Sequence, residues 1–374
     1  MATSRINYSA PFIRSDCARR ILKESGEFVL VDVGVSGGIS SHWRIFEPKF
    51  RAYGFDPLVS ECERLTRQER NANVVYHSAY ISSGVNEAQM DAQSSQASAR
   101  VWTNEAFART SAVRAMRVAS MNFAQLHNAG AEIVLADRRY SLDEFFRSRP
   151  GESVDFLKVD TDGHDFEVLR GAKSMLTAHP VLGVLVEGLF HGEINANANV
   201  FANIDSFLRN EGFSLFDLEP YRYTRAALPG HFIMPMPGPT REGQIVWADV
   251  LYLRDVAAPG YVKQWNITLS TEKIVKLACL FELFGMPDCA AEVLITEQER
   301  LGDRHYLADA LNILASEMDS RFTTLSALSE KFDSEPEYFY PGGGRGLLRR
   351  FLPRSIRGMM SKGRRRLAEF LMRT

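Results

Sequence analysis

The alternation of short apolar runs with segments of helical periodicity places the strongest constraint on how this chain can fold. Runs of six to nine residues rich in Val, Ile, Leu and Phe predict strands that are buried on both faces. Helix-period stretches separate several of them, at residues 59–69, 165–176 and 200–210. The predicted strands cover residues 28–34, 51–57, 73–81, 154–162, 181–189, 214–219 and 248–255.

The order of these elements predicts the fold class. Strands that alternate with helices are joined by right-handed crossovers, which produce a mostly parallel sheet with helices on both faces. No long helix separates the last two runs, so we expect that pair to be antiparallel. The sequence therefore predicts an α/β, Rossmann-like domain with a seven-stranded, mostly parallel sheet.

The remaining segments suggest how the 374 residues are organised. We predict an N-terminal helical segment at residues 1–27, the α/β domain at 28–258 and a helical annex at 259–340. Residues 84–139 are too long for an ordinary connection and predict an insertion. Both this insertion and the irregular stretch 221–243 can be read as a substrate lid or as a surface elaboration.

Composition indicates a soluble globular protein, with 45% hydrophobic and 24% charged residues. The four cysteines form no CxxC pair and no zinc spacing, which favours a reducing compartment. The first residues lack the apolar region of a signal peptide, and no stretch approaches the ~18–20 apolar residues of a membrane span. We therefore expect a cytoplasmic protein.

The last segment, residues 341–374, is strongly basic, with ten Lys or Arg and one acid, Glu369. Its arginines alternate with Leu, Phe, Ile and Met, a pattern typical of a basic amphipathic helix on an anionic membrane surface. Residues 345–374 therefore predict peripheral association with the inner face of the membrane, and a plain basic tail is the other reading. The chain has a net charge of −2 and this segment one of +9, so the rest of the chain has a net charge of −11. That excess of acidic residues disfavours a nucleic-acid partner.

A glycine turn follows the first predicted strand, in the sequence DVGVSGG from Asp32 to Gly38. A dinucleotide fingerprint that starts at Gly34 requires two further glycines, where this chain has Ser36 and Ile39. An acid before the first glycine, and a glycine four residues after it, fit the (D/E)xGxxxG loop of methyltransferases. The predicted ligand is S-adenosylmethionine, and a structural turn is the alternative.

Two further polar positions belong to the same predicted site. Asp56 ends the second strand 24 residues after Asp32, close to the ~20-residue spacing of an acid that binds a ribose. Its alternative role is to cap the helix that begins near Val59. Ser78 lies at the end of the third strand, where we expect the adenine. The predicted cofactor-binding residues are thus Asp32, Gly34, Ser36, Gly38, Asp56, Ser78 and Asp160.

The fourth strand ends in the polar sequence DFLKVDTDGHD. Ligands of open α/β sheets bind beyond the carboxyl ends of the strands, so Lys158, Asp160, Asp162 and His164 are expected in the crevice. Lys158 interrupts an apolar strand and requires a charge partner. Asp165, and with it Asp162, could instead cap the following helix.

In their order and spacing these motifs resemble those of FkbM-type methyltransferases. That family has a DxGANxG-like loop, an FEP-like strand end, an LDEF-like segment, and KIDVEGxE followed by LKGA. This chain has DVGVSGG, GFDP, SLDEF, KVDTDGHD and VLRGA, and its VE and EGFSLFDLE segments also fit. The resemblance covers residues 28–255, although Ser36 replaces an asparagine and Asp162 and Asp165 replace glutamates.

The resemblance implies a class I methyltransferase that transfers a methyl group from S-adenosylmethionine to the hydroxyl of a sugar or glycan, as in polysaccharide biosynthesis. Such an enzyme must align an oxygen with the methyl group, and a general base takes up the proton. The candidate bases are Asp160, Asp162, His164, Glu187 and His191. With Lys158, the first four of these form the predicted catalytic set.

Three alternatives remain at this stage. Asp160 and Asp162 could hold a divalent metal, which is possible but not expected. The chain could be a non-catalytic scaffold with the same fold, held by its basic tail at membrane-bound glycan machinery. An NAD-dependent oxidoreductase is the third possibility, which Ser36 and Ile39 disfavour.

Overall fold

The structure is a computed structural model of the chain. Residues 1–307 and 308–374 form two compact units, which are described separately. The residues whose structure is described are 6–24, 26–84, 105–119, 134–178, 180–302 and 304–341.

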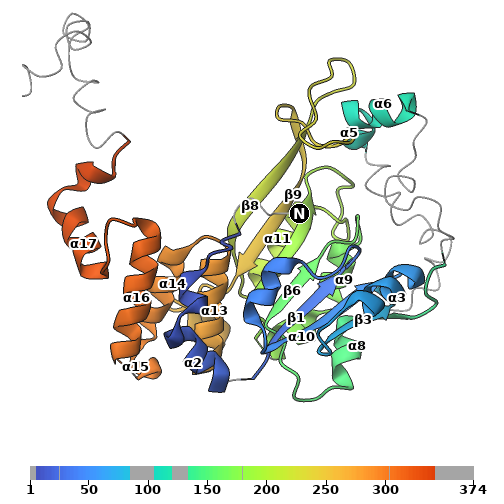
Figure 1. The fold of residues 1–374 in the computed structure, drawn as a ribbon. Coiled ribbons are helices and arrows are strands. Elements are labelled where there is room, and N and C mark those ends of the chain that lie inside the picture. Colours follow the sequence, from blue (N-terminus) through green and yellow to red (C-terminus); the bar gives the residue numbers. More distant parts are fainter. Residues whose placement is uncertain are drawn as a thin grey trace, which may run out of the picture. The chain divides into compact units, whose positions relative to one another are not determined.

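A seven-stranded sheet forms the centre of the first unit, counted over these residues (Figure 1). Its strand order is β3-β2-β1-β6-β7-β9-β8. The first five of these strands are parallel, while β9 runs antiparallel to both β7 and β8. This confirms the predicted sheet and its antiparallel last pair. The strands are β1 (Phe28–Val33), β2 (Phe50–Asp56), β3 (Val74–Ser78), β6 (Phe156–Val159), β7 (Gly183–Leu189), β8 (Ser214–Tyr223) and β9 (Gln244–Leu253).

Helices cover both faces of the sheet. The buried core on one face includes Val29, Val31 and Val33 of β1 and side chains of the helices packed there. On the other face the fully buried Trp43 packs against aromatic rings, among them Phe156 at 4.8 Å between centroids. The first group of helices is α8 (Leu142–Arg147), α9 (Asp165–Arg170), α10 (Lys173–Ala178) and α11 (Phe201–Asn210); the second includes η1 (Ser41–Phe46) and α3 (Val59–Gln68).

Two predicted elements are divided in the structure. The run 73–81 forms β3 and then β4 (Tyr80–Ile81), which pairs with β5 (Arg139–Tyr140) in a separate small sheet. The predicted helix 165–176 is interrupted at Gly171, between α9 and α10. A Cβ atom there would lie 2.0 Å from the carbonyl oxygen of Ser82, so the close approach of that backbone requires a glycine.

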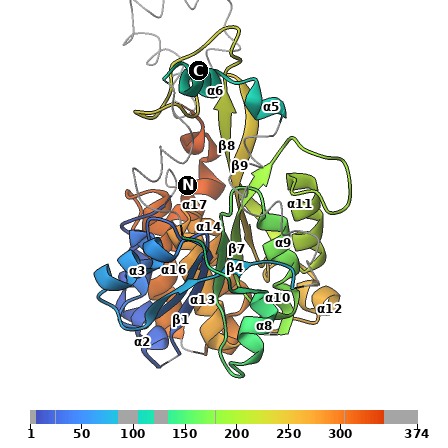
Figure 2. The same ribbon diagram turned by 90° about the vertical axis from the view of Figure 1, so that its right-hand side faces the viewer.

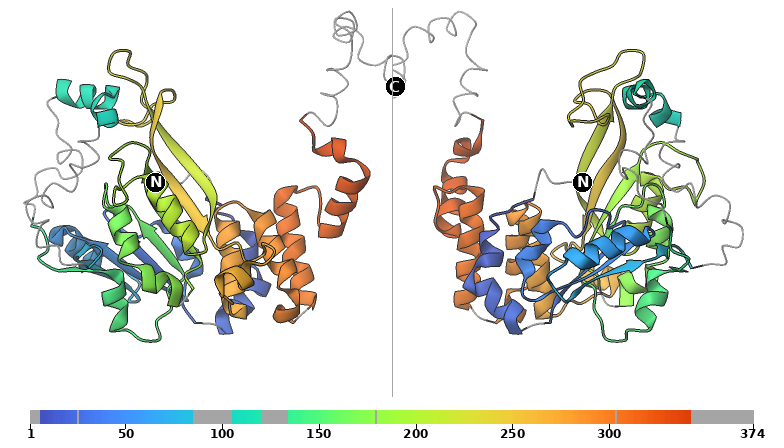
Figure 3. Two further views of the ribbon diagram at one scale, coloured as in Figure 1. Left: turned by 180° about the vertical axis from the view of Figure 1, so that it is seen from behind. Right: turned by 45° about the vertical axis from the view of Figure 1, so that its right-hand side comes forward.

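The hairpin of β8 and β9 is longer than predicted: β8 continues to Tyr223, into the stretch expected to be irregular at 221–243, and β9 already begins at Gln244. Figures 2 and 3 show α5 (Glu105–Ala108) and α6 (Ser111–Val118) beside its far end. Phe107 packs at 5.4 Å from Tyr223 and 5.7 Å from Trp247. Phe107 thus packs on the extended part of both strands. The contact joins residues more than a hundred positions apart in the chain, so the local sequence could not predict it. The parts of the predicted insertion at 85–104 and 120–133 lie outside the described residues.

Buried charges join the flanking helices to the sheet. Asp155, fully buried just before β6, lies 2.8 Å from Lys273 and 3.0 Å from Lys276 of α13. Glu282, at the other end of α13, accepts a hydrogen bond from the backbone of Ile13 at 2.9 Å. These helices therefore share a core with the sheet. They are α1 (Pro11–Arg14), α2 (Asp16–Glu24), α12 (Tyr261–Trp265), α13 (Thr271–Leu283), α14 (Pro287–Thr296) and α15 (Gln298–Leu301).

The second unit contains most of α16 (Arg304–Met318), α17 (Leu325–Ser334) and η3 (Pro336–Phe339). Tyr338 packs 5.8 Å from Phe322 and donates a hydrogen bond to Asp319 at 3.2 Å. The predicted membrane-binding tail lies almost entirely beyond the described residues, so that interaction stays a prediction. Within the described helices, none has both the length and the apolar character needed to span a membrane.

Candidate functional site

The turn after β1 and the end of β6 come into direct backbone contact. Gly34 has a φ of 83°, and a Cβ atom on it would lie 1.7 Å from the carbonyl oxygen of Asp160. Gly38 has a φ of 92°, and a Cβ atom there would lie 2.9 Å from Leu65. Only glycine permits both the conformation and the close approach. Two of the predicted cofactor-binding residues thus shape the floor of the crevice.

Lys158 is held in a buried ion pair across these strands. It lies opposite Asp32 in the parallel register, and its Nζ is 2.9 Å from Asp32 Oδ1 and 3.6 Å from Asp160 Oδ2. Burial by itself lowers the pKa of Lys158, but the charges of Asp32 and Asp160 outweigh it and raise that pKa. The lysine therefore stays charged and positions the two carboxylates.

Asp56 and Ser78 lie side by side in the register of β2 and β3, as the predicted nucleoside site requires. Asp56 Oδ1 accepts a hydrogen bond from the backbone of Leu58 at 2.8 Å, so the carboxylate also orders the turn before α3. Burial is the main cause that raises the pKa of Asp56 to about 6. Asp56 therefore does not cap α3, whose N-cap is Leu58, and its binding of a ribose stays a prediction.

The loop after β6 is organised by Asp165. This fully buried carboxylate accepts hydrogen bonds from the backbone of Thr161 at 3.0 Å and of Gly163 at 3.3 Å. Between them Asp162 has a φ of 52°, a left-handed conformation that a residue other than glycine adopts at some cost. Asp165 therefore holds the loop, and Asp162 is its exposed member.

The carboxylate of Asp162 lies near other acidic groups. Burial, followed by the charges of Asp160 and Asp165, raises the pKa of Asp162 to about 7. A carboxylate with a pKa near neutrality is suited to accept a proton.

The two predicted histidines lie in different environments. His164 Nδ1 is 3.2 Å from Glu167 Oε2, while its buried Nε2 has no hydrogen-bond partner among the described residues. His191 Nε2 is bonded to the carbonyl oxygen of Ile245 at 2.9 Å, which ties the loop after β7 to β9. Nε2 of His164 thus accepts or donates no hydrogen bond within the described part of the chain.

The register also aligns four carboxylates across the sheet, and we call Asp160, Glu187, Asp249 and Glu219 the acid row. Glu187 lies opposite Asp249, and Asp249 lies opposite Glu219. Asp160 and Glu187 directly follow Val159 and Val186, the last paired residues of β6 and β7. Asp249 and Glu219 were not selected from the sequence, because only strand pairing reveals that they are neighbours. The local signal was an acid that directly follows apolar residues in each strand.

Glu187 is the most constrained member of the row. It is 9% exposed, and its Oε2 has no hydrogen-bond partner in the described part of the chain. Burial, and then the charges of Asp160, Asp165 and Asp162, raise the pKa of Glu187 well above its ordinary value. Ionisation of Glu187 is therefore unfavourable beside the other acids of the row.

We expect Glu187→Gln to raise the free energy of unfolding at about pH 8 by about 1 kcal/mol, because it removes a buried like charge. A carboxyl whose folded pKa is raised stabilises the fold below its unfolded pKa, near 4.5, and loses that contribution as the pH rises through the folded pKa. The gain should therefore vanish near pH 4.5. Urea unfolding at both pH values measures it.

Glu193→Gln is the matched control, because Glu193 is exposed in the loop after β7. It should change the free energy of unfolding by less than about 0.5 kcal/mol at either pH. Equal changes in the free energy of unfolding for the two variants would show that neighbouring charges do not destabilise the ionised form of Glu187.

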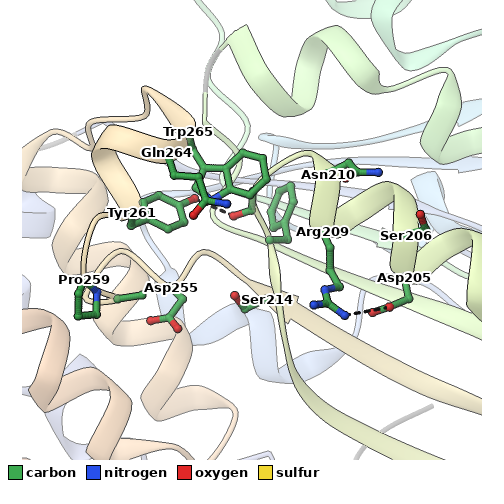
Figure 4. A pocket seen from close by; sticks show the side chains of 13 residues that line it. Asp205, Ser206, Arg209, Asn210, Ser214, Asp255, Pro259, Tyr261, Gln264 and Trp265 are labelled. Carbon is green, nitrogen blue, oxygen red and sulfur yellow. Dashed lines mark hydrogen bonds and ion pairs between the residues drawn. The ribbon is translucent and has the colours of Figure 1, made fainter.

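Two surface cavities are found on this unit, and one of them adjoins the glycine turn. Figure 4 shows one of about 560 Å³, lined by Asp205, Arg209, Asp255, Trp265 and their neighbours. It adjoins Ser214, the first residue of β8, and hence the sheet edge opposite to the crevice. The other, of about 630 Å³, lies beside Gly37 and Gly38 and reaches Tyr76. No group of three or more His, Cys, Asp or Glu in the described residues is placed to hold a metal ion.

The comparison with protein families identifies the central part of the chain. Residues 41–215 match the family model described as "Methyltransferase FkbM domain". This segment holds Asp56, the SLDEF segment and the loop with Asp160 and Asp162, and the glycine turn precedes it directly. The chain carries a methyltransferase FkbM domain. The resemblance noted in the sequence is thereby confirmed, and so is the predicted seven-stranded fold class.

Several solved structures are similar to this chain at low identity. A methyltransferase FkbM from Methylobacillus flagellatus KT is 14% identical with a TM-score of 0.32, and the match covers 61% of this chain and 43% of that one. Magnesium protoporphyrin IX methyltransferase from Synechocystis PCC 6803 is 11% identical with a TM-score of 0.28, covering 66% and 83%. Fibrillarin from Aeropyrum pernix is 14% identical with a TM-score of 0.29, covering 66% and 76%. No curated protein matches the sequence.

Proposed function

We propose that this chain is an S-adenosylmethionine-dependent O-methyltransferase that acts on a sugar hydroxyl of a glycan or glycosylated metabolite. The observation that carries the proposal is the close approach of Gly34 to the backbone of Asp160, at the strand ends that also hold Asp32 and Asp56. A methyltransferase FkbM domain over residues 41–215 supports the reaction type.

The residues of the crevice fit this cofactor. A Cβ atom at Gly34 would overlap the carbonyl oxygen of Asp160, so the missing side chain lets the turn after β1 pack directly on the end of β6. Asp56, at the end of β2, can accept hydrogen bonds from a ribose diol. Asp160 supplies negative charge to a cationic centre, while Lys158 occupies Oδ1 of Asp32.

When bound, S-adenosylmethionine supplies a methyl group activated by a positively charged sulfur. The chain then has to orient an acceptor oxygen in line with that carbon and to exclude water. An acceptor hydroxyl that is methylated would have to give up its proton to a group of the chain. We assign its uptake to Asp162, which is exposed in the crevice and has a pKa of about 7.

The sugar acceptor and a place in polysaccharide biosynthesis rest on the sequence resemblance, whereas a cytoplasmic location rests on the composition of the sequence. The acid row favours a polar acceptor, because its carboxylates can accept hydrogen bonds from several hydroxyl groups. A non-catalytic scaffold would not require Asp162 at this position in the loop.

Binding of S-adenosylmethionine to the full chain, measured by titration calorimetry, tests the cofactor. Asp56→Asn should weaken binding by about tenfold, since it removes a charged acceptor for the ribose hydroxyls. The exposed Asp309→Asn is the control and should leave the affinity unchanged. Saturable binding of NAD in place of S-adenosylmethionine would contradict the proposal.

Methyl transfer from labelled S-adenosylmethionine into fractionated cell extract tests the reaction. The label should appear in a carbohydrate fraction, and Asp162→Asn should lower the rate by about 100-fold while cofactor affinity changes little. Cofactor binding without any labelled product would favour the scaffold. Label in another chemical class would retire the sugar acceptor.

A further inference from the structure

The acid row extends from the cofactor crevice toward the hairpin of β8 and β9. Asp160 lies beside the glycine turn, and Glu187, Asp249 and Glu219 follow on successive strands. Residues directly opposite in antiparallel strands have Cβ atoms about 4.5–5.5 Å apart, and like charges in such pairs are unfavourable. The sheet thus presents a line of closely spaced carboxylates next to the site of methyl transfer.

Two members of the acid row have no basic partner among the described residues. Lys158 is already paired with Asp32 and Asp160. The ion pairs among described residues leave Glu187 and Glu219 without a basic partner, and Oε2 of each is buried without a hydrogen bond. For Glu187, which is 9% exposed, this leaves an unsatisfied carboxylate oxygen in the middle of the row. A buried oxygen of this kind is satisfied when a cationic donor binds beside it.

Aromatic side chains continue the same strands toward the hairpin end. Tyr221 and Trp247 lie opposite each other, two residues along from Glu219 and Asp249, so they share the face of the acid row. Their ring centroids are 5.9 Å apart, and Tyr221 donates a hydrogen bond to Asp249 at 2.9 Å. Both rings are half-buried. Carboxylates beside tyrosine and tryptophan rings are the combination that binds organic ammonium groups.

We propose that the acceptor carries an ammonium group near its methylated hydroxyl, and that Glu187, Asp249 and Glu219 bind this group beside Tyr221 and Trp247. The acceptor class is then an amino sugar or a similar hydroxylated amine. The inference rests on the proposed function, because it assigns the substrate of the same site. The ammonium nitrogen has no lone pair while it is bound, so the hydroxyl oxygen remains the nucleophile.

Other ligands fit the row less well. A phosphate or uronate group would meet four carboxylates with the same sign of charge. A neutral sugar would bring no positive charge to Glu187 and Glu219, which have no basic partner among the described residues. A divalent metal requires ligands that converge, whereas within the described chain no three acidic or histidine groups do so. An organic cation can bridge several carboxylates that are spread along a sheet.

Titration of the full chain loaded with S-adenosylhomocysteine tests the proposal. The probes are D-glucosamine, D-glucose and D-glucuronate at about pH 6.5, where the amine is protonated. We expect glucosamine to bind at least about tenfold more tightly than glucose, with no detectable binding of glucuronate.

Glu219→Gln should weaken glucosamine binding by about tenfold, because it removes one charged partner, and should leave the affinity for S-adenosylhomocysteine unchanged. Glu193→Gln, an exposed acid in the loop after β7, is the matched control and should change neither.

A second readout uses labelled methyl transfer into extract. The proposal expects a product that a cation exchanger retains at this pH and that N-acetylation releases.

Three results would overturn the proposal: glucose binding as tightly as glucosamine, an unchanged affinity in Glu219→Gln, or binding that requires added Mg²⁺. A neutral or acidic methylated product would overturn it as well, while the methyltransferase function would stand. Failure of the chain to bind S-adenosylhomocysteine at all would instead remove the proposed function, and this inference with it.

Discussion

Lys158→Met should lower the free energy of unfolding by about 3–5 kcal/mol, since it leaves Asp32 buried without its positive partner. The two groups are 2.9 Å apart, and their side chains are 6% and 2% exposed. Asp160, at 3.6 Å, loses the same neighbour. Urea unfolding followed by tryptophan fluorescence measures the loss, because Trp43 is fully buried in this unit.

Lys173→Met is the control for Lys158→Met. Lys173 is paired with Glu211 at 3.4 Å, but its side chain is 64% exposed, so the expected loss is below about 1 kcal/mol. In the Asp32→Asn, Lys158→Met double variant, both members of the pair are neutral, and the loss should be clearly smaller than the sum of the two single losses. A loss for Lys158→Met no larger than for Lys173→Met would show that the ion pair does not support the crevice.

Gly34→Ala should abolish cofactor binding and destabilise the unit by several kcal/mol, because its Cβ would lie 1.7 Å from the carbonyl oxygen of Asp160. The overlap is with backbone, so no side-chain rotation relieves it. The turn after β1 or the end of β6 must move, and the crevice is then no longer formed. Calorimetric titration with S-adenosylmethionine and thermal unfolding measure the two effects.

Gly37→Ala is a closely matched control, because Gly34 has a φ of 83° and Gly37 a φ of 84°. Both variants therefore share the cost of a left-handed alanine, about 1–2 kcal/mol. A Cβ atom at Gly37 meets no atom within 4 Å, so only Gly34→Ala adds the overlap. Similar affinity and stability in the two variants would mean that the contact with Asp160 is not required.

Much of the sheet could be predicted from the sequence, because a strand that is buried on both faces is a short apolar run whatever surrounds it. The polar residues at the ends of the first, second and fourth runs also marked one edge of the sheet, since the carboxyl ends of parallel strands meet there. Asp32, Asp56 and Asp160 were selected for this reason, and the register brings Asp32 beside Lys158.

The roles of individual residues were harder to predict. Asp165 was open between a ligand and a cap until its two oxygens were found on the backbone of Thr161 and Gly163. His191 was a candidate base, yet its ring is bonded to the carbonyl of Ile245. Residue type limits what a side chain can do, whereas its neighbours decide which of these roles it takes.

Local periodicity and residue chemistry by themselves determined the alternating strands and helices, the glycine turn and the need of Lys158 for a partner, because each depends on residues close together in the chain. Tertiary structure alone decided the acid row, the long hairpin packed against Phe107, and the attachment of α13 through Asp155. These features join residues that are tens to more than a hundred positions apart. Strand register and side-chain packing bring such residues together, and no local pattern records which of them will meet.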